Sequence, residues 1–491
     1  MLQKKQCAFL LRIRGANNMA VHIVWFRRDL RLSDHQALAK AIENADQAGD
    51  TILGVFHIHP ALTDSFTVRH DYFYETLKAF VDHTNRIKFQ VVFLYGELEE
   101  SFDQLLSSID NVKGIYFNKD ETGFGKTRDD AFESWAEQAS IQTYSFIDHH
   151  LHGAYELLKG DGEHYKVFTP YYKKWRQLGK PEACSIDEDV LTKRSATQSS
   201  VHEAGDEAYK RIMQQKTGKW KDEAGEKAAH DYLATFLDDR IEAYEKDRDF
   251  PEYDGTSQLS KFLRTGALSI RTVFHAVQEK RDQMHNDAGA ETFIQELAWR
   301  DFYNMIYAHY PSSHDKEIKE QYQGIEWRTD EEQLQAWKEG KTGYPLVDAA
   351  MRQLNTTGWM HNRLRMVVAS FLTKHLLIDW RLGEHYFAER LIDYDPASNI
   401  GGWQWAASTG TDAVPYFRVF NPYRQAERFD PHGRFIRSYV EELRDVPTAS
   451  IHKPYEMDKD KQKEYGSDGY PAPIVDHQRA RQRALEAFGG S

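Results

Sequence analysis

Cysteine is nearly absent from this sequence, because its 491 residues include only Cys7 and Cys184. Two thiols exclude a disulfide scaffold and suit a reducing compartment, so we expect a cytoplasmic protein. No apolar run approaches the roughly 20 residues that cross a bilayer, so we expect no membrane association. The formal net charge of −13 excludes bulk attraction to nucleic acid. A local basic groove would still be sufficient to contact phosphates.

Several common catalytic motifs are missing as well. The first strand-like run is followed by "RRDLRLSDH", and the G-x-G-x-x-G turn of the usual dinucleotide site is not there. Neither a P-loop nor a G-x-S-x-G nucleophile motif occurs. The segment "DHHLH" (148–152) carries imidazoles, but no cysteine or carboxylate arrangement completes a zinc site, and we expect no metal.

The first 18 residues, "MLQKKQCAFLLRIRGANN", have only part of the pattern of a signal peptide. The apolar run is too short, and Arg12 and Arg14 interrupt the residues after it. We interpret residues 1–18 as an N-terminal extension, with Met19 as the candidate start of the protein.

The hydrophobic fraction of 41% and the aromatic fraction of 13% are ample for a packed core. Residues 19–150 alternate short apolar runs with helical patterns, which predicts a doubly wound α/β domain with a parallel sheet. The strands are expected at 21–26, 52–58, 90–95 and 112–117. We expect 120–126, "DETGFGK", to be a loop after the fourth strand, where open sheets bind ligands.

The remaining chain has a different pattern. Residues 151–225 are charged and irregular in composition, and we interpret them as an interdomain linker. Residues 226–491 show helical rather than alternating periodicity, which predicts an all-helical domain. One helix is expected to begin near Pro345 and end at Gly358. The apolar stretch 359–380 predicts a further, long helix.

Tryptophan, in contrast, is abundant in the second half. Trp403 and Trp405 lie two residues apart in "NIGGWQWAAS" (399–408), a spacing that lets the rings point to different sides. Other tryptophans in this half are Trp299, Trp327, Trp337, Trp359 and Trp380. The pair is open to three interpretations, which are core packing, a stacking platform and redox chemistry.

Two polar stretches could hold a ligand. "DGTSQLS" (254–260) places hydroxyls at a turn before a helix, as either a phosphate cradle or an ordinary helix cap. "DYDPASN" sets Asp393, Asp395 and Asn399 on an expected irregular segment before the tryptophan pair. These side chains could bind ribose hydroxyls or a ring N–H, or they could be solvated loop residues.

Two helical stretches carry polar groups beside apolar ones. Asn362 and Met366 in "MHNRLRM" are four residues apart and share a face, as do Glu296 and Trp299 in "QELAWRDF", three apart. A carboxylate beside a tryptophan suits recognition of a flat heterocycle. The alternative is an amphipathic helix with a glutamate at the rim of a core tryptophan.

Five long segments of the sequence resemble those of a known protein family. "TGYPLVDAAMRQLNTTGWMHNRLRM", "LLIDWRLGEHYF", "NIGGWQWAASTGTDAVPYFRVFNP", "VHIVWFRRDLRL" and "YKVFTPYYKKW" resemble the photolyase/cryptochrome family, specifically class I cyclobutane pyrimidine dimer photolyases, over about residues 20 to 480. The resemblance implies light-driven DNA repair, in which excited reduced FAD gives an electron to a flipped-out dimer, the dimer splits and the electron returns. The alternative is a blue-light photoreceptor cryptochrome without repair activity. The lesion-facing residues and the short end of the chain favour repair.

The resemblance also implies a domain order, namely an antenna-chromophore domain over 19–150, a linker, and a helical domain that holds FAD. It places Asn399 at the flavin edge near N5 and Arg365 against the isoalloxazine ring. The other positions that it assigns to FAD are Tyr244, Thr256, Ser257, Gln258, Leu259, Ser260, Arg300, Asp393, Tyr394 and Asp395.

For DNA, the resemblance implies aromatic walls, polar base contacts and phosphate contacts. The positions are Trp299 and Trp405 as walls, Glu296, Asn362 and Met366 at the lesion, and Arg363 and Arg418 at phosphates. Enzymes for (6-4) photoproducts carry histidines at the places of Asn362 and Met366, so their absence favours cyclobutane dimers.

Three tryptophans, Trp403, Trp380 and Trp327, match the electron-relay triad of the family. Together with Glu296 and Asn399 they are the residues to which the resemblance assigns the chemistry.

The antenna site departs from the pattern. Folate-binding relatives carry an Asn–Glu pair after the fourth strand, where this sequence has Phe124 and Gly125. Methenyltetrahydrofolate is the expected second chromophore because it is the common one in the family, and a deazaflavin or flavin is the alternative. The expected partner is UV-damaged DNA, with no obligate protein partner and a monomeric chain.

Overall fold

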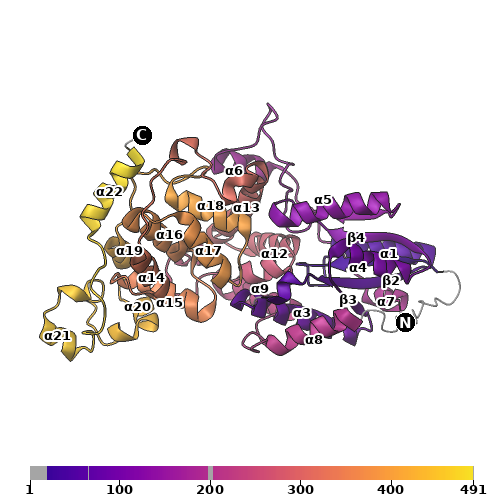
Figure 1. Ribbon diagram of the computed structural model, residues 1–491, viewed down its shortest axis with the longest axis horizontal. Coiled ribbons are helices and arrows are strands. Elements are labelled where there is room, and N and C mark those ends of the chain that lie inside the picture. The colour runs from indigo at the N-terminus through magenta and orange to yellow at the C-terminus, as the bar shows by residue number, and fades with distance from the viewer. Residues whose placement is uncertain (1–18, 65, 197–202, 490–491) are drawn as a thin grey trace, which may run out of the picture. The chain divides into compact units, whose positions relative to one another are not determined.

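The structure is a computed structural model that describes residues 19–64, 66–196 and 203–489 (Figure 1). The predicted extension 1–18 lies outside the described residues. Two compact units are built from interleaved stretches of chain. The first comprises the described residues up to Leu151 with Lys180–Asp231 and Phe262–His275, and the second comprises His152–Gly179, Tyr232–Lys261 and the described residues from Ala276 onward.

The first unit contains a five-stranded parallel sheet in the order β3-β2-β1-β4-β5. Its strands are β1 (Val21–Phe26), β2 (Thr51–Ile58), β3 (Val91–Tyr95), β4 (Val112–Asn118) and β5 (Thr143–Phe146). All six residues of β1 are buried, as expected for a strand covered on both faces. The predicted doubly wound sheet is therefore confirmed. Strand β5 is not among the predicted strands, because it is a half-polar edge strand with no apolar run.

Helices of the first unit flank the sheet and include two within the supposed linker. They are α1 (Gln36–Ala48), α2 (Ala61–Asp64), α3 (Val68–Arg86), α4 (Leu98–Ser107), α5 (Gly123–Gln138), α7 (Glu188–Arg194) and α8 (Glu203–Gln215). The expectation of an irregular chain over 151–225 is wrong for these segments and for α6 (Phe168–Gln177). Asp71 of α3 accepts the backbone N–H of Thr217 at 2.9 Å, one of the contacts that order this stretch.

The expected loop at 120–126 is shorter than predicted, because α5 begins at Gly123. The helix starts close against the end of β4, where Asp129 accepts the backbone N–H of Asp120 at 2.7 Å. A Cβ on Gly125 would lie 2.5 Å from Asp120 Oδ2, so a larger residue would collide there.

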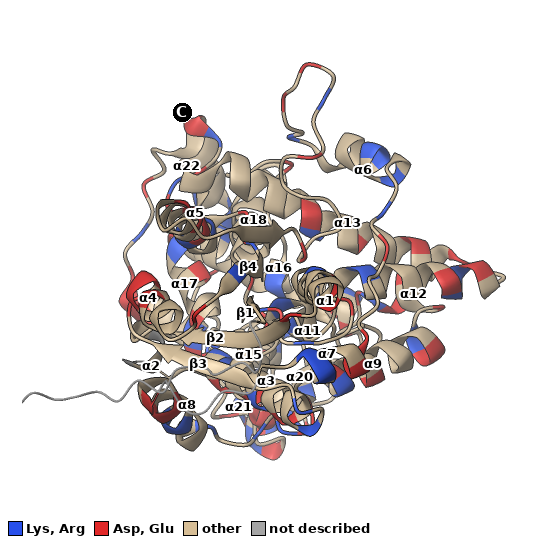
Figure 2. Ribbon diagram, turned by 90° about the vertical axis from the view of Figure 1, so that its right-hand side faces the viewer, with Lys and Arg blue, Asp and Glu red and all other residues tan. Residues whose placement is uncertain are grey.

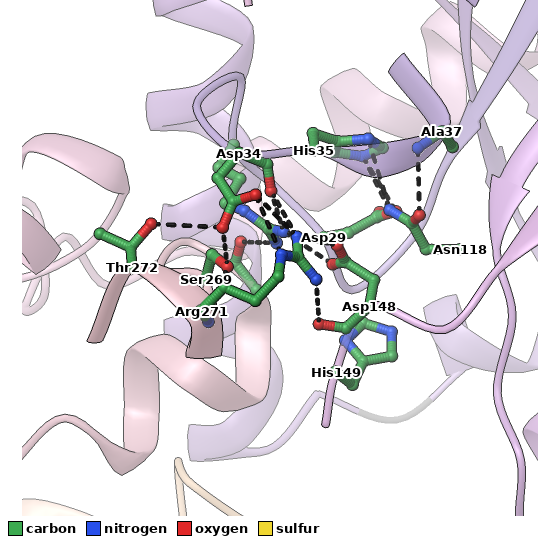
Figure 3. A network of polar contacts seen from close by, with 12 residues as sticks. Asp29, Asp34, His35, Ala37, Asn118, Asp148, His149, Ser269, Arg271 and Thr272 are labelled. Atoms are coloured by element: carbon green, nitrogen blue, oxygen red, sulfur yellow. Dashed lines mark hydrogen bonds and ion pairs between the residues drawn. The ribbon is translucent and has the colours of Figure 1, made fainter. Parts of the chain in front are cut away.

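The stretch "RRDLRLSDH" forms part of a buried ion network (Figure 3). Arg271 lies between Asp34 and Asp148, with its guanidinium 3.0 Å and 2.7 Å from their oxygens. Arg31 donates to both oxygens of Asp148, at 2.9 and 2.7 Å. Burial would raise the pKa of Asp148, but Arg31 and Arg271 hold it far below the ordinary value. The oxygens of Asp148, the only acid in "DHHLH", therefore bind arginines.

The second unit is helical in its described residues. Its elements include α10 (Tyr244–Asp247), α13 (Ala288–His309), α14 (Glu331–Glu339), α15 (Pro345–Thr357), α16 (Asn362–Ser370), α17 (Trp380–Arg390), α18 (Pro396–Ala407), α19 (Pro422–Phe429), α20 (Arg434–Tyr439), α21 (Lys459–Glu464) and α22 (His477–Gly489). The π-helical η1 (Phe236–Arg240) also belongs to the second unit, whereas α9 (Glu226–Thr235), α11 (Ser260–Thr265) and α12 (Ile270–Gln283) each contain residues of both units. The helix predicted between Pro345 and Gly358 is confirmed, with Gly358 at a φ of 73°.

Two predictions of local structure are wrong. Residues 359–380 do not form one helix, because α16 runs into a π-helical turn, η4 (Phe371–Leu376), and Leu377 then adopts a φ of 53°. The side chain of Asp379 caps the next helix, accepting the backbone N–H of Arg381 at 3.0 Å. The end of "DYDPASN" is helical, since Asp395 caps α18 through the Ser398 N–H at 3.0 Å. Asn399 therefore projects from a helix and not from an irregular segment.

Candidate functional site

Asp393 is the point at which three separately predicted segments meet. Its Oδ2 accepts hydrogen bonds from Ser260 Oγ at 2.7 Å and from Arg365 Nη2 at 2.8 Å. Arg365 is held in place because its Nε donates to the carbonyl of Met360 at 2.9 Å. Asp393 Oδ1 is buried and has no hydrogen-bond partner among the described residues. A buried oxygen of this kind is an acceptor available to a donor on a bound group.

Asn399 is fixed by a residue that the sequence patterns do not single out. Its Nδ2 donates to Glu384 Oε1 at 3.0 Å, and the same oxygen accepts from Tyr394 at 2.9 Å. Glu384 is buried on α17. Because the NH₂ group of Asn399 is turned toward Glu384, its carbonyl oxygen faces the opposite way and can accept a hydrogen bond from a bound group. The only sequence signal for Glu384 is its place inside a matched segment.

The predicted turn 254–260 contains one residue with a left-handed backbone. Gln258 adopts a φ of 52°, and its amide donates to Asp254 at 3.1 Å. The hydroxyl residues Thr256 and Ser257 are half-buried, and Leu259 is buried beside them. Ser260, the last residue of the turn, is the one bonded to Asp393.

Tyr244 and Glu296 are joined through an arginine just after α10. Glu296 Oε1 accepts from Arg248 Nη1 at 2.7 Å, and the Arg248 guanidinium lies 5.4 Å from the Tyr244 ring. Burial raises the pKa of Tyr244, with the Glu296 charge adding to the effect. Arg363, predicted to contact phosphate, forms an ion pair with Asp249 at 2.8 Å. Neither Arg248 nor Asp249 is among the residues predicted from the sequence.

Trp299 is half-buried on α13 and already stacks on one ring. Its centroid lies 3.6 Å from that of Phe168, at an interplanar angle of 7°. Phe168 begins α6, whose sequence "FTPYYKKWRQ" has three basic residues and no acidic one. Figure 2 shows this basic helix. Lys173 and Lys174 are exposed, and they form a local basic surface on an acidic protein.

Trp403 and Trp405 lie on different sides of α18, as residues two apart on a helix must. Trp403 is buried and Trp405 half-buried. Gly401, four residues before Trp405 and on the same side of α18, packs against α13, where an added Cβ would be 2.2 Å from the Tyr303 ring.

The other predicted site residues are distributed around these groups. Arg300 is half-buried on α13, Met366 is half-buried on α16, and Asn362 and Arg418 are exposed. Asp395 is half-buried and caps α18.

The three predicted relay tryptophans lie in or against one apolar core cluster. The Trp403 ring contacts Trp337 and Phe387, with centroid distances of 6.1 and 5.1 Å. Trp380 Nε1 donates to Glu317 Oε1 at 3.1 Å. Trp327 contacts the ring of Phe488 at 5.9 Å.

The described residues contain neither a metal-binding cluster nor a membrane-spanning helix. No cluster of three or more His, Cys, Asp or Glu side chains in them could hold a metal ion. No helix in the described part of the chain is long and apolar enough to span a membrane.

Comparisons with known proteins identify the family of this chain. Residues 22–187 match the family model "DNA photolyase", and residues 293–490 match "FAD binding domain of DNA photolyase". A deoxyribodipyrimidine photo-lyase of Alkalihalophilus pseudofirmus is 43% identical over 96% of this chain and 99% of its own.

Solved structures give the same result. A class III photolyase from Agrobacterium tumefaciens has a TM-score of 0.87 at 35% identity, covering 97% of this chain and 99% of that one. A Sulfolobus tokodaii photolyase with two FAD molecules has a TM-score of 0.76 at 30% identity, covering 96% and 100%.

The fold and the matches define a flavin-binding enzyme with an α/β unit and a helical unit. The chain belongs to the DNA photolyase family. Light-driven DNA repair is its function, and FAD is the cofactor of its helical domain. The monomeric state and the cytoplasmic location stay predictions.

Proposed function

We propose that this chain splits cyclobutane pyrimidine dimers in UV-damaged DNA, with FAD held around Asp393 and Asn399. The observation that carries the proposal is the convergence of Ser260 and Arg365 on a buried carboxylate that keeps one oxygen unpartnered among the described residues. A buried acceptor without a partner costs about 1–3 kcal/mol, so a protein retains one where a ligand satisfies it. The N–H and O–H groups of FAD are suitable donors.

The same residues fit the rest of the cofactor. The Thr256–Ser260 turn offers hydroxyls and backbone N–H groups to phosphates, and the carbonyl oxygen of Asn399 is fixed by Glu384. Bound, reduced and illuminated FAD supplies the single electron that the repair requires. The buried core around Trp403 keeps water away from that side of the site.

The lesion is held by residues next to this cofactor site. Trp405 and Trp299 stack on the dimer, and Glu296, oriented by Arg248, accepts from its base edges. Met366 lies against the dimer, and Asn362 contacts its polar edge. Neither side chain can donate a catalytic proton, which suits a cyclobutane dimer because its splitting needs only electron transfer.

DNA is attracted by local charge. The Lys173 and Lys174 side chains of α6 lie on the same short helix as Phe168, the ring that stacks on Trp299. Phosphates beside the lesion can therefore be neutralised although the net charge is −13. Arg418 is exposed and can join them, whereas Arg363 must first exchange Asp249 for a phosphate.

The α/β unit carries the second chromophore, which we propose to be a flavin or deazaflavin in place of the folate expected by family habit. Phe124 is 78% exposed, and Gly125 is pressed against Asp120, so neither supplies the amide and carboxylate of the folate pair. The two FAD molecules of the Sulfolobus tokodaii photolyase implicate a novel light-harvesting cofactor in that protein. An absorption spectrum of the purified protein, with the chromophores then released and separated, tests this.

The repair reaction is tested by illuminating dimer-containing DNA with chemically reduced, FAD-loaded protein and measuring the restored thymines. We expect light-dependent repair by the parent and by Asp282→Asn, an exposed control. Asp393→Asn should bind FAD more weakly, by roughly tenfold or more, because it loses the charge that pairs with Arg365. Full FAD binding without any repair would favour the photoreceptor alternative over the enzyme.

A further inference from the structure

Glu317 is a buried carboxylate that the repair reaction leaves without a role. It lies in the segment between α13 and α14, and only 4% of the residue is exposed. Its Oε1 accepts the indole N–H of Trp380 at 3.1 Å. A buried acid is rarely kept without a charged or hydrogen-bonded partner, and here the hydrogen-bonded partner is a tryptophan ring.

The segment that carries Glu317 is anchored by the residue between the two tryptophans of "WQW". Gln404 is fully buried. Its Nε2 donates to the carbonyl of Lys316 at 2.8 Å, and its Oε1 accepts the N–H of Ile318 at 3.0 Å. These two bonds hold the backbone on both sides of Glu317. The carboxylate is therefore placed by α18, the same helix that carries Trp403.

The charges around the Trp380 ring do not cancel. Arg381 forms an ion pair with Asp379 at 2.8 Å and lies 3.6 Å from Glu317, with its guanidinium 5.7 Å from the ring. Among Arg381, Asp379 and Glu317, one cation is thus shared by two carboxylates, and one negative charge remains within this group. A positive charge on the Trp380 ring would be stabilised by that excess.

The neighbouring indoles lack such a charge. Trp337, whose ring contacts Trp403, donates its N–H to the neutral carbonyl of Val368 at 3.1 Å. The N–H of Trp403 is buried and has no hydrogen-bond partner among the described residues. The Trp403 ring packs against α17 at Gly383. Trp380 lies three residues before Gly383 and therefore on the same face of α17 as the Trp403 contact.

We propose that Glu317 directs electron transfer in this protein by stabilising the oxidised form of Trp380 over that of Trp337. The proposal rests on the proposed function and on the predicted tryptophan relay, in which photoexcited oxidised flavin would take an electron from Trp403. In the step considered, one electron passes from Trp380 to oxidised Trp403, and no atom changes place. The Trp380 N–H stays hydrogen-bonded to Glu317. Glu317 acts through Trp380 and is a positioning residue.

The test is flash photolysis of the FAD-loaded, oxidised protein, with the yield and lifetime of tryptophan radicals as the readout. Glu317→Gln keeps an acceptor for the indole N–H and removes only the charge. We expect it to lower the yield of long-lived radicals by roughly tenfold, because a unit charge within hydrogen-bonding distance is a large effect at a buried site. Glu320→Gln, an exposed position nearby, is the control and should behave as the parent.

A second variant predicts a change of the opposite sign. Arg381→Gln leaves Asp379 and Glu317 without their shared cation, so oxidised Trp380 should live longer than in the parent. A radical yield in Glu317→Gln equal to that of Glu320→Gln would overturn the inference, as would a shorter lifetime in Arg381→Gln. If Trp380→Phe itself forms long-lived radicals like the parent, the predicted tryptophan relay fails and this inference fails with it, whereas dimer repair by reduced FAD would be unaffected.

Discussion

One added methyl group at Gly383 tests how tightly Trp403 is held. A Cβ built there would lie 2.1 Å from Trp403 Cη2 and 2.6 Å from Leu372 Cδ2. Ordinary carbon contacts are near 3.5–4.0 Å, so a substitution forces a shift of roughly 1.5 Å. Both neighbours are buried in one apolar cluster and have no solvent into which they can withdraw. Gly383→Ala should therefore displace the indole.

Two effects of this substitution on stability oppose each other. Alanine in place of glycine within a helix contributes about 0.5–1 kcal/mol of stability. Overpacking a buried site costs about 1–3 kcal/mol. The second effect is larger, so we expect a net loss of about 1 kcal/mol. Gly402 on α18 separates the two effects, because no heavy atom lies within 4 Å of the position its Cβ would take. Gly402→Ala should gain about 0.5–1 kcal/mol.

Urea unfolding followed by circular dichroism measures both variants against the parent. The midpoint should fall for Gly383→Ala and rise for Gly402→Ala. Flavin photoreduction provides a second readout, which should slow in Gly383→Ala if Trp403 has moved away from the cofactor. Equal stabilisation by the two alanines would show that the Trp403 ring has room to move, and the packing argument would then be wrong.

Three further outcomes are expected. Arg271→Met should destabilise the protein by about 3–5 kcal/mol in urea unfolding, because it breaks a buried pair, whereas Arg281→Met at a partly exposed pair should cost at most about 1 kcal/mol. Burial raises the pKa of Asp301 to about 6 from 3.8, so its stabilising effect is full below pH 4 and is lost as pH rises through 6. Asp301→Asn should reduce the change in the free energy of unfolding between pH 4 and 7, measured by urea unfolding, by up to about 3 kcal/mol. Trp405→Ala should weaken binding of dimer-containing DNA by about 1–3 kcal/mol in a titration, and unchanged affinity would remove its assigned role.

The sequence predicts elements well where burial alone decides them. The strands β1 to β4 are short runs of apolar residues buried by helices, and the predicted ranges agree with them to within a residue or so. The edge strand β5 carries half-exposed residues and leaves no such run. The break between α16 and α17 is not visible in the sequence either, because side chains and distant segments determine it. Arg328, for example, donates its backbone N–H to the Leu377 carbonyl at 2.8 Å.

The candidate site also contains residues that the sequence predicts and residues that only the folded structure brings together. Residues inside the matched segments, such as Asp393 and Asn399, can be named from the resemblance alone. The partners of the site residues cannot, because Glu384 meets Asn399 and Glu317 meets Trp380 only through the packing of helices. No spacing along the chain marks a carboxylate that meets an indole 63 residues away.

The short stretch "WQW" shows why sequence and structure both matter here. On α18 its three side chains point in three directions, since successive residues turn by about 100°. Trp403 enters the core beside Gly383, Gln404 holds the segment around Glu317, and Trp405 stays half-buried on another side. A rotation of α18 would change all three contacts together. We therefore predict that the proposed electron relay and the proposed lesion wall are coupled mechanically, so a substitution at Gln404 should affect both.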